Sequence, residues 1–198
     1  RITDRSYQRQ SCEWFSNGGN DRFTKEGDYY LSEGEKKQIA EITKYNQNIV
    51  LIINTGAQID LTEMQQNEAV KGIVYLSQPG CEAGNVIADI ISGKVNPSGK
   101  LTSTWSVKYE DFPNAATFSH CNGDTTNEKY EEGIYVGYRY FDSFGVKTLY
   151  PFGYGLSYTT FTTDHVQVAA EGNTVTVTAT VTNTGKAAGK QVVEVYAA

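Results

Sequence analysis

Apolar residues in the first half of the chain recur with the spacing of a helix and then of buried strands. Ser32 can cap a helix together with Glu35, and Ile39, Ile42 and Tyr45 mark one apolar face of that helix. The continuous apolar runs at 49–54 and 70–76 follow it. Their length is typical of parallel strands that are buried on both faces.

Two further helices are expected around the second of these strands. One covers 61–69 and the other covers 82–92, where a helical spacing of apolar residues ends at Gly93, a common helix terminator. Strands that alternate with helices predict an α/β fold with a mostly parallel open sheet sandwiched by helices. Ligand sites of such sheets lie beyond the carboxyl ends of the strands.

The second half of the chain has a different texture. Residues 96–158 are rich in Gly, Pro and Tyr, and this stretch is too long for an ordinary connection, so it is expected to wrap around a packed surface. Apolar and polar residues then alternate at 166–168, 174–183 and 191–196, as in an antiparallel sheet. About three strands are present where a β-sandwich needs roughly seven, so an incomplete β-sandwich is predicted.

Charge and composition exclude several classes of partner. The 198 residues carry 17 Lys and Arg against 23 Asp and Glu, a net charge of −6, without a basic stripe for nucleic acid or anionic lipid. No apolar run is long enough to span a membrane, and Arg1 to Gln10 are too polar for a signal peptide. The three cysteines are widely spaced, which favours a soluble protein of a reducing compartment such as the bacterial cytoplasm over a secreted or periplasmic one.

Four motifs together resemble glycoside hydrolase family 3. They are Pro-Gly-Cys-Glu-Ala-Gly-Asn-Val-Ile-Ala-Asp at 79–89, Gly-Lys-Val-Asn-Pro-Ser-Gly-Lys-Leu at 93–101, Tyr-Glu-Glu-Gly-Ile-Tyr-Val-Gly-Tyr-Arg-Tyr-Phe-Asp at 130–142, and Tyr-Pro-Phe-Gly-Tyr-Gly-Leu-Ser-Tyr-Thr-Thr-Phe at 150–161. Their order along the chain is also that of the family. The resemblance covers nearly the whole chain after Asp21.

The resemblance implies a retaining β-glucosidase built from several domains. A barrel domain carries an aspartate nucleophile, an α/β sandwich domain carries the acid/base residue, and a fibronectin-III-like domain often follows. On this basis 1–104 is expected to be the α/β sandwich domain with its N-terminal part missing, 105–160 an aromatic-rich segment at the domain interface, and 161–198 the start of a fibronectin-III-like β-sandwich. The expected partners are an oligosaccharide or β-glucoside substrate and the barrel domain of the same protein, with no metal and no other cofactor.

The family's acid/base glutamate commonly sits in an Arg-x-Ser-Gly-Glu segment that precedes an Asp-Arg pair. Arg9-Gln10-Ser11-Cys12-Glu13, followed by Asp21-Arg22, is similar to that pattern, which predicts Glu13 as the general acid/base. Trp14 and Phe15 would lower the local polarity, keep the carboxyl protonated and contact the sugar. Arg9, Asp21 and Arg22 are expected to support the loop.

Two departures from the pattern leave an alternative open. Cys12 replaces the usual glycine, and the interval from Glu13 to Asp21 is long, so an alignment without a gap would place Gly18 at the glutamate position. In that case the chain would be a non-catalytic carbohydrate-binding or structural module. Glu26 is the next acid/base candidate, whereas Glu82, Asp89 and Asp142 are expected to hold the fold, and His120 and His165 have no assigned role. Within the enzyme class, β-xylosidase and β-N-acetylglucosaminidase activities also fit.

Overall fold

The computed structural model describes residues 2–4, 26–27, 29–118, 122–124 and 126–197. The chain divides into two compact units. The first combines Arg1–Ala83 with Ser103–Pro151, and the second combines Gly84–Thr102 with Phe152–Ala198. The chain therefore passes from the first unit to the second and back before it ends in the second.

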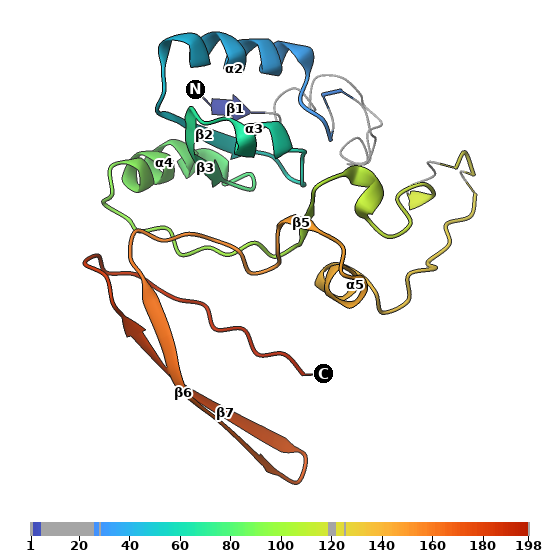
Figure 1. The fold of residues 1–198 in the computed structure, drawn as a ribbon, viewed down its shortest axis with the longest axis vertical. Helices are drawn as coiled ribbons and strands as arrows, with labels where there is room; N and C mark the ends of the chain where they lie inside the picture. The colour runs from blue at the N-terminus through green and yellow to red at the C-terminus, as the bar shows by residue number, and fades with distance from the viewer. Residues whose placement is uncertain (1, 5–25, 28, 119–121, 125, 198) are drawn as a thin grey trace. The chain divides into compact units, whose positions relative to one another are not determined.

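A parallel sheet forms the centre of the first unit (Figure 1). Its strands are β1 (Ile2–Asp4), β2 (Ile49–Asn54) and β3 (Val70–Tyr75), in the order β1-β2-β3, with both pairs parallel. Leu51 to Ile53 are buried, as their unbroken apolar run predicts. The parallel pairing of the two apolar runs is confirmed. The sequence pattern did not indicate β1, because it is three residues long and two of the three are polar.

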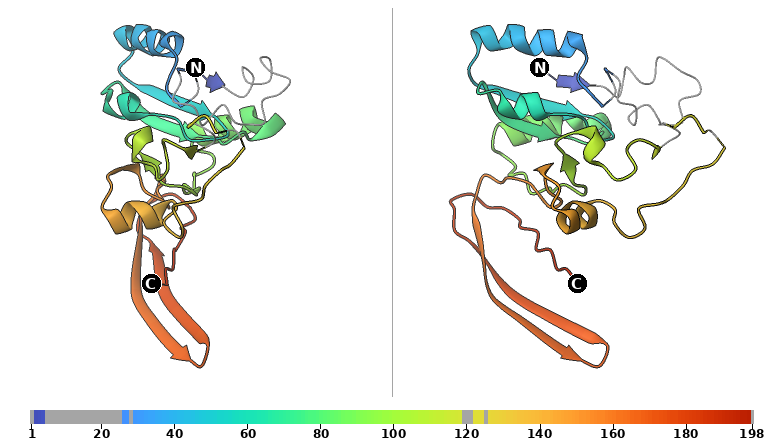
Figure 2. Two further views of the ribbon diagram at one scale, coloured as in Figure 1. Left: turned by 90° about the vertical axis from the view of Figure 1, so that its right-hand side faces the viewer. Right: turned by 45° about the vertical axis from the view of Figure 1, so that its right-hand side comes forward.

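Helix α2 (Glu33–Tyr45) begins where the sequence predicted. The Ser32 side chain accepts a hydrogen bond from the Glu35 backbone, and the Glu35 side chain accepts one from the Ser32 backbone, which completes a capping box. In Figures 1 and 2 the helix lies on the β1 side of the sheet. The assignment of Tyr45 to the packed face is wrong, because Tyr45 is 78% exposed at the last turn.

Helix α3 (Thr62–Gln66) is shorter than the predicted 61–69. It ends at Asn67, whose side-chain Oδ1 accepts a hydrogen bond from the Ala69 backbone at 3.0 Å and whose carbonyl accepts one from Val70 at 2.9 Å. Asparagine side chains compete with helix hydrogen bonds in this way, so the chain turns here and enters β3.

The segment expected to be irregular contains short regular elements, among them the 3₁₀ turn η3 (Tyr109–Asp111). Strands β4 (Trp105–Ser106) and β5 (Thr148–Tyr150) pair antiparallel, and α5 (Tyr138–Phe144) lies between them in sequence. Edge-to-face ring contacts run through this part of the first unit, between pairs drawn from Tyr29, Tyr75, Trp105, Tyr109, Phe112, Phe141 and Tyr150. Three aromatic residues of this stretch, Trp105, Tyr109 and Phe141, are therefore core residues of the first unit, whereas others such as Tyr130 and Phe144 are exposed.

Helix α4 (Ala83–Ile91) follows the 3₁₀ turn η2 (Gly80–Glu82) and terminates as predicted. Gly93 adopts a φ of +76°, a conformation that glycine reaches without the steric cost of a Cβ atom. Lys94 Nζ then lies 2.9 Å from the carboxylate of Asp89. This contact supports the structural role expected for Asp89.

Asn96 holds three segments of the second unit together. Its Oδ1 accepts hydrogen bonds from the Ser157 hydroxyl at 3.0 Å and from the Tyr158 backbone at 2.8 Å, and its Nδ2 donates to the Ala188 carbonyl at 2.9 Å. The Leu101 backbone also exchanges hydrogen bonds with Gly153 and Tyr154. Hydrogen bonds thus connect the motif at 93–101 directly with the motif at 150–161.

The second unit ends in a hairpin of β6 (Phe161–Glu171) and β7 (Thr174–Asn183), paired antiparallel as expected. The expected strand at 191–196 is wrong, because these residues pair with no strand in the part of the chain that the structure describes. A fibronectin-III-like domain is not evident either, since this sheet has two strands. Among the described residues, no helix is long and apolar enough to cross a bilayer.

Candidate functional site

The carboxyl ends of the three parallel strands meet at one edge of the sheet. Asp4 lies opposite Asn54 in the register, and Ile53 lies opposite Tyr75. Ligands of open α/β sheets bind beyond this edge. The segment that contains Glu13 directly follows β1 in the sequence, so the chain leaves the sheet at this edge before it reaches the predicted acid/base residue.

The predicted catalytic, sugar-binding and loop-supporting residues themselves lie outside the described residues. They are Arg9, Glu13, Trp14, Phe15, Asp21 and Arg22. Their roles stay predictions.

Glu26, the reserve candidate, lies within the described residues. Its Oε1 accepts a hydrogen bond from the Glu33 backbone at 2.5 Å, at the first turn of α2. A carboxylate at this position interacts favourably with the helix N-terminus. The structure thus gives Glu26 a local structural contact.

The ends of β2 and β3 are fastened to each other by an arrangement that the sequence did not indicate. Asn54 Oδ1 accepts a hydrogen bond from the Gln78 backbone at 3.1 Å, and both Ser77 and Gln78 have positive φ angles, of 49° and 56°. The Gln78 side chain covers Gly56, where an added Cβ would lie 2.9 Å from Gln78 Oε1. Left-handed backbone at non-glycine residues costs about 1–3 kcal/mol each and persists where surrounding contacts impose it.

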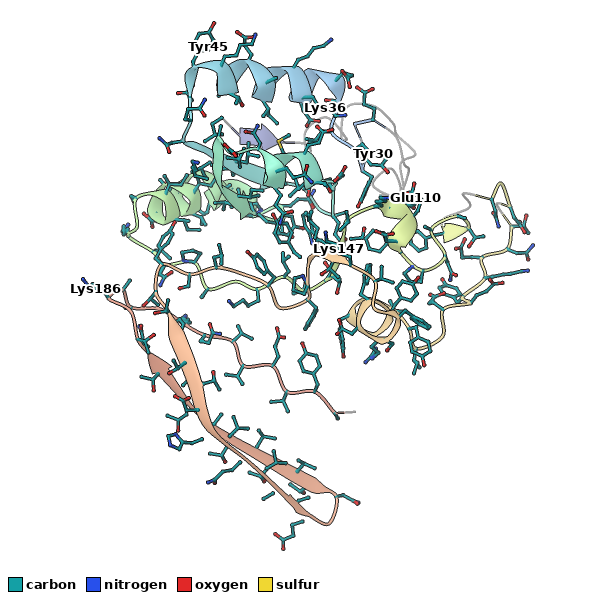
Figure 3. The ribbon with its side chains drawn as sticks, in the orientation of Figure 1. Tyr30, Lys36, Tyr45, Glu110, Lys147 and Lys186 are labelled. Carbon is teal, nitrogen blue, oxygen red and sulfur yellow. The ribbon has the colours of Figure 1, made fainter. Side chains whose placement is uncertain are left out.

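A pocket of about 190 Å³ opens between the start of α2 and the start of α3. Tyr30, Leu31, Lys36, Asp60 and Glu63 line it. Both helices begin after a connection that leaves the carboxyl edge of the sheet, which explains why their first turns come together here. Figure 3 shows Lys36, Tyr30 and Glu110 following one another on the same side of the first unit.

Hydrogen bonds fix the backbone beneath this pocket. The Asp60 backbone donates to the Tyr29 carbonyl at 2.8 Å, and Asp60 Oδ1 accepts from the Thr62 backbone, at the first residue of α3, at 2.9 Å. Tyr29 is buried, and its hydroxyl lies 3.3 Å from Ser106 Oγ. Burial is the main cause that raises the pKa of Tyr29 to about 12. Tyr29 therefore anchors the segment before α2 as a neutral phenol.

The other ionisable residues that the structure describes give no second site. His165 is exposed and has a φ of 51° at a bulge in β6, between Asp164 and Gln167. His120 lies outside the described residues. Within the described ranges, no group of three or more His, Cys, Asp or Glu side chains is placed to hold a metal ion.

Comparison with known proteins decides the family. Residues 7–138 match the sequence model of the glycosyl hydrolase family 3 C-terminal domain. The chain belongs to glycosyl hydrolase family 3. The family membership inferred from the four motifs is thereby confirmed. The match covers 132 residues of this family 3 chain, from 7 to 138.

Relatives of the family 3 chain are much longer proteins. Beta-glucosidase A of Butyrivibrio fibrisolvens is 37% identical over 86% of this chain and 22% of its own length. An exo-alpha-(1->6)-L-arabinopyranosidase of Bifidobacterium longum is 41% identical over 81% of this chain and 21% of its own. The structure of beta-glucosidase 3B from Thermotoga neapolitana superposes with a TM-score of 0.77 at 38% identity and covers 85% of this chain and 24% of that one. The chain therefore spans less than a quarter of the length of each of these relatives.

Proposed function

We propose that this chain is part of a retaining exo-β-glycosidase, specifically a β-glucosidase that releases terminal non-reducing β-linked glucose from oligosaccharides or glucosides. The observation that carries the proposal is the family match over 7–138, together with relatives at 36–37% identity that are named beta-glucosidases. The nucleophile is an aspartate of a barrel domain that belongs to the same protein.

Glu13 acts as the acid/base residue in this proposal. In a retaining glycosidase one carboxylate attacks the anomeric carbon, and the other protonates the leaving oxygen and later removes a proton from water. Trp14 and Phe15 supply apolar surroundings that keep the Glu13 carboxyl protonated and a surface against the sugar, while Arg9, Asp21 and Arg22 support the loop. The position of β1 supports this role, because the chain passes from its carboxyl end directly into this segment.

The domain organisation expected from the sequence belongs to the same proposal: an α/β sandwich domain over 1–104, an interface segment over 105–160 and the start of a fibronectin-III-like β-sandwich over 161–198. The hairpin supports it. Val168 pairs with Val177 and Ala170 with Val175 on one face, whereas Thr176 and Thr178 belong to the other. Both Val168 and Val175 are at least 65% exposed. An apolar face of this kind is what one sheet of a sandwich presents to the other.

A second candidate function rests on the Bifidobacterium longum relative, whose name specifies cleavage of α-(1→6)-linked L-arabinopyranose. At 41% identity it is as similar to this chain as the relatives named beta-glucosidases are. The pocket that selects the sugar would lie mainly outside this chain in either case.

The test uses the intact polypeptide that contains this chain. Nitrophenyl β-D-glucopyranoside and nitrophenyl α-L-arabinopyranoside are compared by kcat/KM, and the anomer released first is identified by proton NMR. The proposal predicts a preference for the glucoside and β-glucose as the first product, because two displacements retain configuration. A preference for the arabinoside would favour the second candidate. Release of α-glucose would contradict a retaining mechanism, and hydrolysis of neither substrate would favour the non-catalytic module.

A further inference from the structure

An exposed turn of the first unit places an asparagine side chain against the peptide bond that follows it. Asn122 and Gly123 are both exposed. Asn122 Oδ1 accepts a hydrogen bond from the Asp124 backbone at 3.0 Å, so the side chain folds over its own C-terminal peptide group, as in an Asx turn. Gly123 has a φ of 83°, and nothing lies within 4 Å of the position of an added Cβ. The amide carbon of Asn122 is therefore turned toward a backbone nitrogen that no side chain shields.

This geometry favours a reaction within the turn, because the two reacting groups are already held side by side. The Gly123 nitrogen loses its proton and attacks Asn122 Cγ, the new N–C bond closes a cyclic succinimide, and the side-chain nitrogen takes up a proton and leaves as ammonia. Water then opens the ring at either carbonyl, which gives aspartate or isoaspartate. We propose that Asn122–Gly123 is a self-modification site, at which the folded protein converts asparagine to aspartate and isoaspartate and thereby opens the turn.

Other asparagines lack this combination of features. Asn114 donates from Nδ2 to Glu132 Oε2 at 2.5 Å, which holds its amide group in place. Asn96 is followed by Pro97, whose nitrogen carries no proton to lose. Of the asparagines in the part of the chain that the structure describes, Asn122 is the one followed by glycine, the residue that hinders the attack least. The reaction is therefore expected at Asn122 and not at these other positions.

Conversion to isoaspartate changes the turn itself. The main chain then passes through Cβ of residue 122, so the acceptor of the Asp124 backbone is displaced. Asp124 Oδ1 in turn accepts hydrogen bonds from the Thr126 backbone at 2.9 Å and from the Asn127 backbone at 3.0 Å, which continues the turn to residue 127. The product also places a new carboxylate near that of Asp124, in a chain whose net charge is already −6. Both changes should loosen residues 122–127.

Peptide mapping of the intact polypeptide tests this proposal. The folded protein is incubated in neutral and in mildly alkaline buffer, and the aspartate and isoaspartate forms of the peptide that contains Asn122 are separated and measured by mass spectrometry over time. The rate should rise about tenfold for each pH unit, because the attacking nitrogen must first lose its proton to base. The peptide that contains Asn114 is the internal control and should stay unmodified. Asn17-Gly18, which lies outside the described residues, is on a separate peptide and does not affect the measurement.

Variants separate the reaction from its structural effect. Asn122→Gln should abolish the conversion, and Gly123→Ala should slow it about tenfold, because a Cβ crowds the attacking nitrogen. Asn48→Gln, at an exposed asparagine elsewhere, is the matched control and should convert at residue 122 like the parent. Hydrogen exchange of the peptide that contains Asn127 should accelerate on incubation in the parent and stay unchanged in Asn122→Gln.

Three results would overturn the proposal. The first is an Asn122 that stays intact in the folded polypeptide under conditions in which the urea-unfolded polypeptide converts, because the fold would then protect the site. The second is conversion of Gly123→Ala as fast as that of the parent. The third is hydrogen exchange at Asn127 that conversion leaves unchanged, because the turn would then stay closed. None of these measurements depends on glycosidase activity or on the role of Glu13.

Discussion

The side chain of Asn96 accepts a hydrogen bond from the backbone of Tyr158, 62 residues later in the chain, at 2.8 Å. The Tyr158 hydroxyl in turn donates to the Ile90 carbonyl at 3.0 Å, near the end of α4. Because Asn96 also bonds Ser157 and Ala188, one side chain connects the segment after α4 with two distant segments of the second unit. The family motifs at 93–101 and 150–161 therefore contain residues that hold distant segments of the second unit together.

Replacing Asn96 with alanine should loosen the second unit. The backbone amide of Tyr158 and the carbonyl of Ala188 would lose their partner, and because both hydrogen bonds are exposed and water can replace it, the loss should be about 0.5–1.5 kcal/mol. Hydrogen exchange of the peptide that contains Tyr158 should accelerate, and the urea midpoint of unfolding should fall. Asn48→Ala, at an exposed position between α2 and β2, is the control and should change neither. Unchanged exchange at Tyr158 in Asn96→Ala would show that this hydrogen bond does not hold the segment.

Two glycines of the second unit should respond in opposite ways to alanine. A Cβ on Gly155 would lie 2.5 Å from the Gly99 carbonyl oxygen, so Gly155→Ala should destabilise by about 1–3 kcal/mol. Gly84 is in the first turn of α4 with nothing within 4 Å of an added Cβ, so Gly84→Ala should stabilise by up to about 1 kcal/mol. Urea unfolding of both variants measures the difference, and equal effects would contradict the close approach of Gly155 to Gly99.

Local signals in the sequence were sufficient for the elements that depend on neighbouring residues. The capping box of Ser32 and Glu35, the buried run of β2 and the termination of α4 at Gly93 each involve residues close in sequence. The pairing of β4 with β5 was not predictable in this way, because two strands of two and three residues meet across more than forty positions. The alternation at 191–196 is real, but alternation makes a strand only where a partner strand supplies hydrogen bonds.

The candidate site was predictable to a smaller extent. The motif around Glu13 gave residue types, but the described residues do not include it. The pocket beside Tyr30 had no sequence signature, because its five lining residues come from two separate stretches, 30–36 and 60–63, that only the fold brings together. Nor could the positive φ angles of Ser77 and Gln78 be expected, since neither residue is glycine.

The stability of the first unit should fall at high pH because of Tyr29. Its pKa of about 12 in the folded chain exceeds the ordinary value of 10.0, so the folded state binds the phenolic proton more tightly than the unfolded state. The resulting stabilisation is present below about pH 10 and is lost as the pH rises toward about 12, by roughly 2 kcal/mol in all. Urea unfolding between pH 8 and pH 11.5 should show a shallower decline in Tyr29→Phe than in the parent chain. Tyr45→Phe, at an exposed tyrosine, should decline like the parent.

The 198-residue chain alone should not hydrolyse nitrophenyl β-D-glucopyranoside. In the proposed mechanism the attacking aspartate belongs to a domain outside this chain, and one carboxylate without the other supports neither displacement. The measurement is release of nitrophenol by a purified preparation, beside the intact polypeptide as the positive control. Turnover by the chain alone that survives further purification would show that both catalytic groups lie within these 198 residues.

Azide rescue of Glu13→Ala in the intact polypeptide tests the central claim most directly. Loss of the general acid/base should lower turnover of a natural disaccharide by about 10²–10⁴-fold and that of an activated aryl glucoside by less, because a good leaving group needs little protonation. Azide needs no general base, so it should restore turnover of the aryl glucoside and yield β-glucosyl azide, whereas Glu26→Ala should retain the parent's activity and gain nothing from azide. Near-normal activity of Glu13→Ala on both substrates, or a loss of activity that azide does not repair, would contradict the assignment of Glu13 as the acid/base residue.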